Sequence, residues 1–251
     1  LHHSLLALNA SLGGRLRVFR GDPLEILPAV AAASGAKQVV WNRCYESWRI
    51  ARDTAVKAAL GDAKITAQSF NGSLLWEPWT IRKKDDTPYK VFTPFYRRGC
   101  LAAPSPRLPL PVPAGLKLTP LDETALPYVT DIEGLDLLPT QDWADQVAAH
   151  WTPGEDAANA RLQVFLQEGL SGYKEGRNFP ARPNTSRLSP HLHWGELSVN
   201  QAWYSVRDIM DGGALAADAD TFLSELGWRE FSHSLLFTCP ELPRRNLQPK
   251  F

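Results

Sequence analysis

Apolar residues in the first hundred positions alternate between helical and strand spacing. The predicted elements are helices near 5–12, 23–34 and 46–60 and strands near 16–20, 37–42 and 65–70. Asp22 is the expected N-cap of the second helix, with Pro23 at its first position, where a missing N–H costs nothing. Because strands alternate with helices, we expect parallel pairing in a doubly wound α/β sheet, which binds ligands beyond the carboxyl ends of its strands.

The pattern of the last hundred residues is helical throughout. Helices are predicted near 144–151, 156–171, 192–206 and 221–237. Gly195 offers a kink, or an end followed by a restart, before the stretch from Val199 to Met210. We therefore expect an all-α domain from about Trp143 onward.

A proline-rich stretch separates the two patterns. Residues 101–120 contain six prolines. Proline fixes the backbone and donates no hydrogen bond, so we expect an extended linker on the surface; a long ordered loop that crosses the α/β domain is the alternative. The predicted parts are an α/β domain without its first strands, the linker and the first part of an all-α domain, over residues 1–103, 104–142 and 143–251.

Composition excludes several classes of protein. Basic and acidic residues number 27 each, so no global positive field indicates nucleic acid. The three cysteines lie far apart without a C-x-x-C pair, which fits reduced thiols in a cytoplasmic protein rather than a disulfide scaffold or a zinc ribbon. We identify no signal peptide and no apolar run near the roughly 18 residues of a membrane span. The sole methionine is Met210 and the chain opens in a helical pattern, so we expect an internal fragment of a longer protein.

The segment from Thr185 to Ser189 concentrates hydroxyls, a guanidinium and backbone amides just before a predicted helix. Helix N-termini carry unpaired N–H groups and partial positive charge, so this chemistry suits a phosphate; an ordinary helix cap is the alternative. The preceding residues favour the phosphate. Four cations against one acid lie between 174 and 187, and Tyr173 adds a phenol that can bond a phosphate oxygen.

A second cluster follows about forty residues later. Glu225, Trp228 and Arg229 have offsets of i, i+3 and i+4, so we expect their side chains on one patch of a helix. A salt bridge over a core tryptophan is one interpretation. The other is a base-binding face, on which the tryptophan stacks on an unstacked base, the arginine reaches a DNA phosphate and the carboxyl meets a base edge.

The remaining reactive side chains give weaker signals. His191 and His193 are two residues apart and do not share a helical face, and no acidic or cysteine partner is evident, so we expect no metal site. Cys239 is expected to be a buried thiol rather than a nucleophile, since no paired base is visible. The first half contains no G-x-G-x-x-G, P-loop or G-x-S-x-G motif.

These segments carry a resemblance to a known family. Residues 185–198 resemble the flavin-binding signature of the DNA photolyase/cryptochrome family, and 222–231 resemble its substrate-facing helix. Residues 70–75 and 91–95 resemble the end of its α/β domain. The motifs occur in the family's order along essentially the whole chain, and they are most like those of a bacterial class I cyclobutane pyrimidine dimer photolyase.

The resemblance implies a cofactor and its ligands. In the family, FAD lies in a helical domain, and blue light excites its reduced form, which passes an electron to a pyrimidine dimer flipped out of DNA. The implied FAD-binding residues are Tyr173, Thr185, Ser186, Arg187, Leu188, Ser189 and Phe222. Phe222 stands where the family usually has a tryptophan, so an N–H donor is lost. A second, antenna chromophore is implied in the α/β domain; folate, deazaflavin and a second flavin stay open.

The resemblance also implies the contacts with damaged DNA. Arg177 and Arg229 are expected to contact DNA, and Trp228 to pack against the flipped dimer. Glu225 is expected to hydrogen-bond the dimer and stabilise its negative charge during repair. We therefore expect a monomeric light-driven repair enzyme that binds no membrane, while the fragment alone should bind FAD poorly and repair little.

Two alternatives remain. Relatives that act on (6-4) photoproducts and animal cryptochromes tend to carry glutamine at the position of Glu225, and plant cryptochromes tend to lose the tryptophan, so the pair Glu225 and Trp228 favours repair over a cryptochrome-type blue-light photoreceptor. An unrelated α/β nucleotide-binding protein with a helical appendage is the third reading of the residues.

Overall fold

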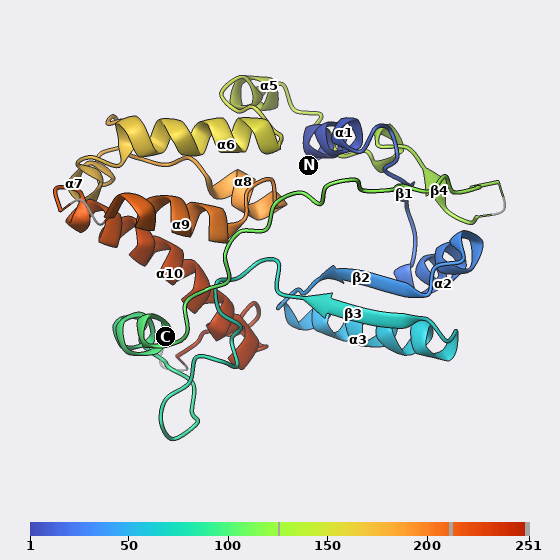
Figure 1. Cartoon of the computed structure of the whole chain (residues 1–251), viewed down its shortest axis with the longest axis horizontal. Coiled ribbons are helices and arrows are strands. Elements are labelled where there is room, and N and C mark those ends of the chain that lie inside the picture. Colours follow the sequence, from blue (N-terminus) through green and yellow to red (C-terminus); the bar gives the residue numbers. More distant parts are fainter. Residues whose placement is uncertain (125, 211–212, 249–251) are drawn as a thin grey trace.

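The computed structural model describes residues 1–124, 126–210 and 213–248, so the last residues of the predicted all-α domain, 249–251, lie outside it (Figure 1). Its first 70 residues form α1 (His2–Ser11), β1 (Val18–Phe19), α2 (Pro23–Ser34), β2 (Gln38–Asn42), α3 (Ser47–Asp62) and β3 (Thr66–Phe70). Strands β2 and β3 pair in parallel, with Val40 opposite Gln68, and α3 lies along one face of the pair (Figure 1). The predicted parallel α/β arrangement is confirmed for these two strands.

The first predicted strand does not join this sheet. Strand β1 pairs antiparallel with β4 (Val129–Thr130), with Val18 opposite Thr130. The prediction of a third parallel strand at 16–20 was wrong. A strand buried on both faces of a parallel sheet is almost continuously apolar, whereas Arg17 and Arg20 interrupt this one. Its partner arrives from more than a hundred residues further along the chain, which local spacing does not reveal.

Local signals fix the bounds of α2. The Asp22 carboxylate accepts a hydrogen bond from the backbone N–H of Leu24 at 2.8 Å, and Gly35 ends the helix at φ +66°. The predicted N-cap is confirmed, because a side-chain oxygen there satisfies a donor that the helix leaves unpaired. A glycine at the end of the helix adopts the left-handed conformation without the clash that a Cβ would cause.

The middle of the chain crosses the molecule as an extended segment. Short helical turns come first: α4 (Phe92–Pro94), the π-turn η1 (Phe95–Gly99) and the 3₁₀ turn η2 (Cys100–Ala102). From residue 103 to 124 the chain contains no helix or strand (Figure 1). Leu110 and Val112 in this segment are exposed to solvent. The side-chain amide of Asn200 holds this segment by donating to the carbonyl of Arg107 at 2.8 Å. The segment ends at β4, η3 (Glu133–Leu135) and α5 (Trp143–Ala148).

The last hundred residues are helical, as predicted. They form α6 (Glu155–Val164), the π-turn η4 (Phe165–Gly169), α7 (Tyr173–Gly176), α8 (Ser189–Trp194), α9 (Val199–Met210) and α10 (Ala216–Thr238). The break near Gly195 is confirmed, since α8 ends there at φ +77°. Ser198 and Gln201 then exchange hydrogen bonds of 3.1 and 3.0 Å in a capping box that starts α9.

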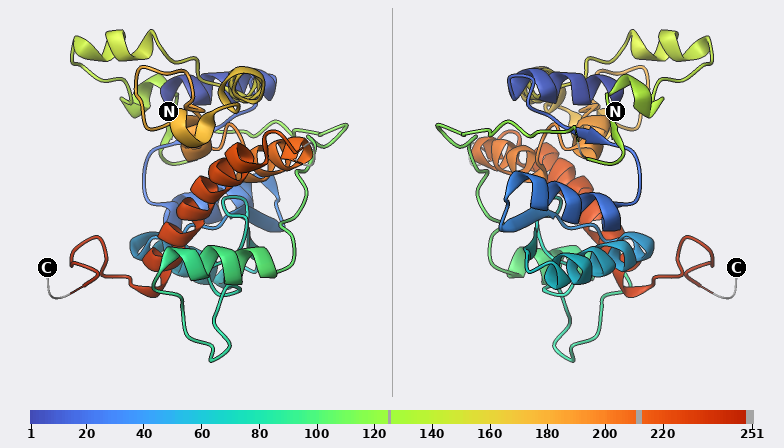
Figure 2. Two further views of the ribbon diagram at one scale, coloured as in Figure 1. Left: turned by 90° about the vertical axis from the view of Figure 1, so that its left-hand side faces the viewer. Right: turned by 90° about the vertical axis from the view of Figure 1, so that its right-hand side faces the viewer.

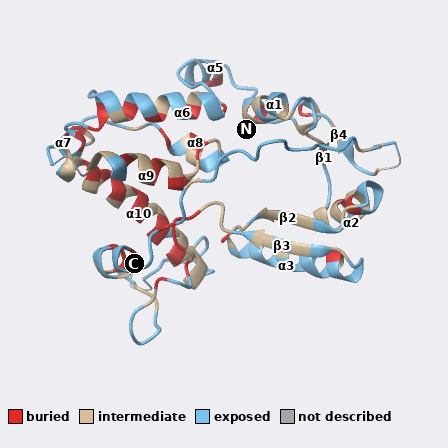
Figure 3. Ribbon diagram, in the orientation of Figure 1, coloured by how far each residue is buried: buried red, intermediate tan, exposed pale blue. Residues whose placement is uncertain are grey.

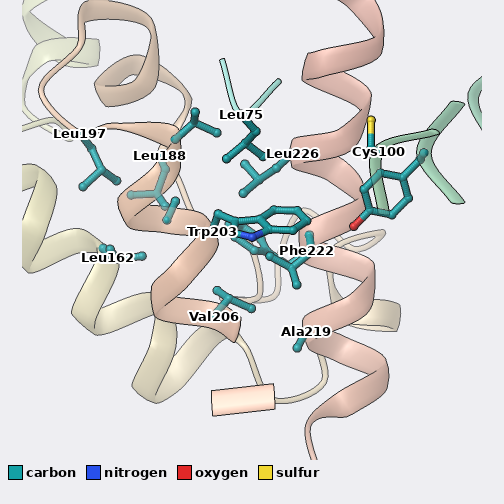
Figure 4. Packing of buried hydrophobic residues seen from close by; sticks show 14 of the residues in the cluster. Leu75, Cys100, Leu162, Leu188, Leu197, Trp203, Val206, Ala219, Phe222 and Leu226 are labelled. Atoms are coloured by element: carbon teal, nitrogen blue, oxygen red, sulfur yellow. The ribbon is translucent and has the colours of Figure 1, made fainter. Parts of the chain in front are cut away.

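The main hydrophobic core lies between α6, α9 and α10 (Figures 3 and 4). Trp203 is 1% exposed at its centre and meets Trp76 edge to face, with ring centroids 5.3 Å apart. Residues 75–100 contribute Leu75, Trp76, Phe95, Tyr96 and Cys100 to this core. Packing thus joins a stretch before the predicted boundary at 103 to the helical part, and the boundaries at 103 and 142 stay predictions.

The cysteines and the helices can be checked for disulfide bonds and for membrane spans. Cys44, Cys100 and Cys239 are free thiols, in line with the absence of a disulfide framework from the sequence. Among the described residues, no helix combines the length and the apolar character that crossing a bilayer requires.

Candidate functional site

A cavity of about 590 Å³ lies where the helical part meets the loop that follows β2. One face of α10 forms a wall of it. The cavity residues on that face are Phe222, Glu225, Leu226, Arg229 and His233. Their spacing of three or four residues keeps them on one side of a helix, as expected for a wall that a helix presents along its length. Figure 2 shows α10 running diagonally through the molecule, so this wall is anchored in the core.

Tyr173 enters the cavity from α7, and the sequence holds this short helix in place. The Asp218 carboxylate accepts hydrogen bonds from the backbone N–H groups of Gly172, at 2.9 Å, and Lys174, at 2.8 Å. The ring of Tyr173 packs against Phe222, with centroids 5.5 Å apart. Burial is the main reason that the pKa of the Tyr173 phenol lies above its usual value, so the hydroxyl stays a hydrogen-bond donor.

The predicted phosphate segment divides between two cavities. Ser186, Leu188 and Ser189 line the main cavity, whereas Arg187 lines a separate one of about 310 Å³ next to His191. Arg187 has φ +54°, a left-handed conformation that turns its side chain away from its neighbours. Thr185 is exposed. The structure therefore brings three of the five predicted residues, Ser186, Leu188 and Ser189, into the main cavity and leaves Thr185 and Arg187 outside it.

Glu225 and Arg177 form an ion pair at the edge of the cavity, with about a third of each side chain exposed. The guanidinium of Arg177 also lies 5.6 Å from the centre of the Tyr173 ring. The hydrogen bond to Glu225 raises the pKa of Arg177, which is already a permanent cation. Sequence reasoning gave these two side chains separate contacts with DNA, but the structure brings them together.

Trp228 lies beside this patch and does not line the cavity. Its indole stacks on the ring of Phe92, with centroids 3.8 Å apart and planes 10° from parallel, and remains 45% exposed. Glu225 and Arg229 do share the cavity face, so the predicted three-residue patch holds for this pair only. The open face of the indole is available for stacking by a planar ligand.

Sequence reasoning missed the opposite wall. Arg43, Tyr45 and Arg49 line the cavity from the loop after β2 and the start of α3. Arg43 forms an ion pair with Glu77, and the buried Tyr45 donates to the same carboxylate at 2.7 Å. Their position in the sequence could have revealed this wall, because they follow the carboxyl end of β2, and parallel sheets bind ligands beyond the carboxyl ends of their strands.

The histidines have structural partners. His191 Nδ1 lies 2.6 Å from Glu196 Oε2, so the expectation that it has no acidic partner was wrong; the buried pair also receives the backbone N–H of Gly154. Burial lowers the pKa of His233, whose ring contacts the carbonyl of Arg229 at 2.9 Å. Within the described ranges, no group of three or more His, Cys, Asp and Glu side chains is arranged to hold a metal ion.

The arrangement suits an anionic ligand with an apolar part. Arg43, Arg49 and Arg229 supply guanidinium donors, each of them also paired with a carboxylate, of Glu77, Glu46 and Glu230 respectively. Ser186 and Ser189 supply hydroxyls, and carbon atoms of the α10 face cover the rest. The volume falls within the range of roughly 300–1,000 Å³ that small-molecule and cofactor sites occupy. The cavity can therefore bind a phosphorylated cofactor beside the Glu225–Arg177 pair.

Comparisons with known proteins identify the relatives of this chain. Residues 1–114 match the family model of DNA photolyase. The chain is 41% identical, over its whole length, to a deoxyribodipyrimidine photo-lyase of Agrobacterium fabrum, of which it covers 52%. It is 30% identical to Cryptochrome-1 of Arabidopsis thaliana, over 98% of this chain and 37% of that protein.

A solved structure shows the same fold. The crystal structure of a bacterial class III photolyase from Agrobacterium tumefaciens superposes on the whole chain with a TM-score of 0.90 and 39% identity, and 52% of that protein is covered. That relative is of class III, whereas the motifs of this sequence suggested class I. The chain spans about half the length of the curated photolyases of Agrobacterium fabrum and a Synechococcus strain, and 37% of Cryptochrome-1. It belongs to the DNA photolyase/cryptochrome family.

Proposed function

We propose that this chain is the part of a light-driven DNA repair enzyme that holds FAD and receives a cyclobutane pyrimidine dimer. The observation that carries the proposal is the shared cavity. Tyr173 and the serines of the phosphate segment lie in one cavity with Glu225 and Arg229, although about 40 to 55 residues separate the two groups in sequence. A cofactor and a substrate bound there would be neighbours.

The residues present fit FAD. Its two phosphates require cations and donors, which Arg43, Arg49 and the hydroxyls of Ser186 and Ser189 can supply. Its planar ring systems require apolar walls, which the α10 face provides. When bound and reduced, FAD supplies the electron that splits the dimer after excitation by blue light.

The side chains of this chain would bind and orient the dimer. Glu225, positioned by Arg177, can accept a hydrogen bond from a base edge. Trp228 can stack on the unpaired bases through its open face, already held flat by Phe92. Arg229, on the cavity wall, can donate hydrogen bonds to a phosphate.

The test is light-dependent repair of an ultraviolet-irradiated oligothymidylate by the whole protein loaded with FAD, followed by the recovery of absorbance at 260 nm. We expect the Trp228→Ala variant to lose about 5- to 140-fold in affinity for dimer-containing DNA, since stacking of a base is worth about 1–3 kcal/mol. Trp143→Ala removes a more exposed indole from α5, 62% against 45% for Trp228, and serves as the control. Equal affinities for the two variants would contradict the assignment of Trp228.

A blue-light photoreceptor is the second candidate, supported by the similarity to Cryptochrome-1. Bound FAD that responds to light, without any loss of dimers, would favour it. We further propose a second chromophore of folate or deazaflavin type in the α/β part. The absorbance spectrum of the purified whole protein, compared with that of free FAD, tests this part of the proposal.

A further inference from the structure

A second cavity, of about 310 Å³, has no lining residue in common with the candidate site. It lies between α6, α8 and the residues just before α6, and we define it by His150, Trp151, Thr152, Arg161, Arg187 and His191. Its lining thus combines two guanidinium groups, two imidazoles, a hydroxyl and an indole. Among the described residues that line it, none is acidic. The second cavity is therefore suited to an anion.

Both arginines of the second cavity are available to a ligand. Neither the guanidinium of Arg161 nor that of Arg187 forms an ion pair or a hydrogen bond with another described residue. The three arginines of the main cavity differ, because Arg43, Arg49 and Arg229 are each paired with a carboxylate. A guanidinium group binds phosphate oxygens through two parallel hydrogen bonds, so two unpaired groups in one hollow match an anion with several oxygen atoms.

A buried imidazole adds a further polar atom to this cavity. His191 is 5% exposed, and its Nδ1 lies 2.6 Å from Oε2 of Glu196. Burial acts to raise the pKa of Glu196, but hydrogen bonds from Ser4, His191 and Gly154 outweigh it and lower this pKa, so the group is a carboxylate at neutral pH. The carboxylate accepts the proton of Nδ1 and leaves Nε2 as the free ring atom, without a partner among the described residues. In the imidazolium form, Nε2 can donate a hydrogen bond to an anion.

The backbone at Arg187 separates its side chain from those of its neighbours. Ser186 and Leu188 line the main cavity, whereas Arg187 lines the second cavity and has φ +54°. Residues with a Cβ rarely adopt this conformation, and those that do cluster at ligand sites. One segment of the chain thus presents hydroxyls to the main cavity and a guanidinium group to the second.

We propose that the second cavity binds a small phosphate monoester, with its phosphate between Arg161 and Arg187 and its organic part against the indole of Trp151. The volume lies at the lower end of the range of roughly 300–1,000 Å³ for small-molecule sites, which suits a single phosphorylated unit rather than a dinucleotide. Trp151 is 37% exposed and offers an apolar ring beside the cations. A phosphate monoester carries close to two negative charges at neutral pH, one for each unpaired guanidinium group.

The test is calorimetric titration of the chain with adenosine 5′-monophosphate, with adenosine and with inorganic phosphate. We expect the monophosphate to bind and adenosine not to bind, because adenosine lacks the anion. Inorganic phosphate should bind more weakly than the monophosphate, because it leaves the indole uncovered. If adenosine or inorganic phosphate bound as tightly as the monophosphate, or if the monophosphate did not bind, the assignment of a phosphate monoester would be overturned.

Two arginine variants locate the bound monophosphate. Arg187→Gly removes one guanidinium group, and glycine adopts φ +54° without strain. Arg161→Ala removes the other group from α6. Each change should raise the Kd of the monophosphate by about 10- to 140-fold, the effect of losing a hydrogen bond to a charged group. Arg245→Ala removes the same charge from an exposed arginine outside both cavities and should leave the Kd unchanged.

Competition with FAD separates the two cavities. Saturating FAD should leave the Kd of the monophosphate unchanged, because no residue of the second cavity lines the main cavity. Circular dichroism spectra that match the parent chain exclude unfolding of the variants. Displacement of the monophosphate by FAD, with equal Kd values for the parent and both arginine variants, would assign the monophosphate to the main cavity and refute the proposal.

Discussion

Glu230 is a buried carboxyl group that joins α10 to the segment after β3. Its side chain is 2% exposed, and Oε2 accepts the backbone N–H groups of Leu75, at 2.9 Å, and Trp76, at 3.2 Å. Oε1 lies 3.2 Å from Arg229. Burial raises the pKa of Glu230 to about 7 from 4.5, although Arg229 and the two N–H donors act in the opposite direction. The loss of hydration on burial therefore dominates.

This raised pKa predicts how stability depends on pH. Between pH 4.5 and 7 the folded chain keeps the proton on Glu230 while the unfolded chain releases it. Stability therefore falls as pH rises through this window, and the contribution is fully present only below pH 4.5. A difference of 2.5 in pKa, the gap between 7 and 4.5, corresponds to about 3 kcal/mol at about 1.4 kcal/mol for each pKa unit.

The assay is urea unfolding of the parent chain and of Glu230→Gln between pH 4 and 8, followed by circular dichroism. The glutamine does not titrate, so the parent should lose about 3 kcal/mol relative to the variant over this range. His233, whose pKa burial lowers, titrates in both proteins and cancels in the difference. Glu241→Gln, at an exposed carboxyl, controls for the change in net charge. If the free energies of unfolding of the parent and of Glu230→Gln changed with pH in parallel, or if the parent gained stability with rising pH, burial would not dominate the pKa of Glu230.

Three further substitutions test the geometry of the site by urea unfolding. Gly227→Ala should lower the free energy of unfolding by about 1–3 kcal/mol, because a Cβ there would lie 2.5 Å from the Tyr96 ring. An unchanged free energy of unfolding would show that α10 can shift. Phe222→Ala should cost about 3–5 kcal/mol as a 3% exposed core aromatic, and a loss below 1 kcal/mol would contradict its packing. Asp218→Ala should lower the free energy of unfolding by about 1 kcal/mol, because it removes the acceptor for the backbone N–H groups at the start of α7. Asp218→Asn keeps an acceptor oxygen and should have a smaller effect. Equal losses for the two variants would argue against the cap that positions Tyr173.

Elements with strong local signals were predictable from sequence. The bounds of α2 follow from Asp22, Pro23 and Gly35, whose backbone preferences act within a few residues. The parallel pair β2–β3 follows from two strand patterns that flank a helix. The antiparallel pairing of β1 with β4 was not predictable, because it depends on where the extended segment crosses the molecule.

The candidate site was predictable in part for the same reason. Helical spacing places Glu225 and Arg229 on one face, and the cavity confirms it. The Arg187 side chain lines the other cavity, and Arg187 itself has a left-handed backbone conformation that no periodicity in the sequence indicates. Glu230 looks like a surface residue in a polar stretch of helix, and only the approach of Leu75 and Trp76 from the other end of the chain makes it a buried acceptor.

The rotation of α10 about its own axis determines several contacts of the site at once. Residues 226–230 are consecutive and meet several separate neighbours. Leu226 and Arg229 line the cavity, and Leu226 also reaches the core. Gly227 meets the ring of Tyr96, Trp228 the ring of Phe92 and Glu230 the amides of residues 75–76. Successive side chains on a helix point about 100° apart, so rotating α10 to improve one contact would disrupt the other four. Three of these neighbours belong to residues 75–96. This stretch therefore sets the position of Glu225 and Arg229 without lining their cavity.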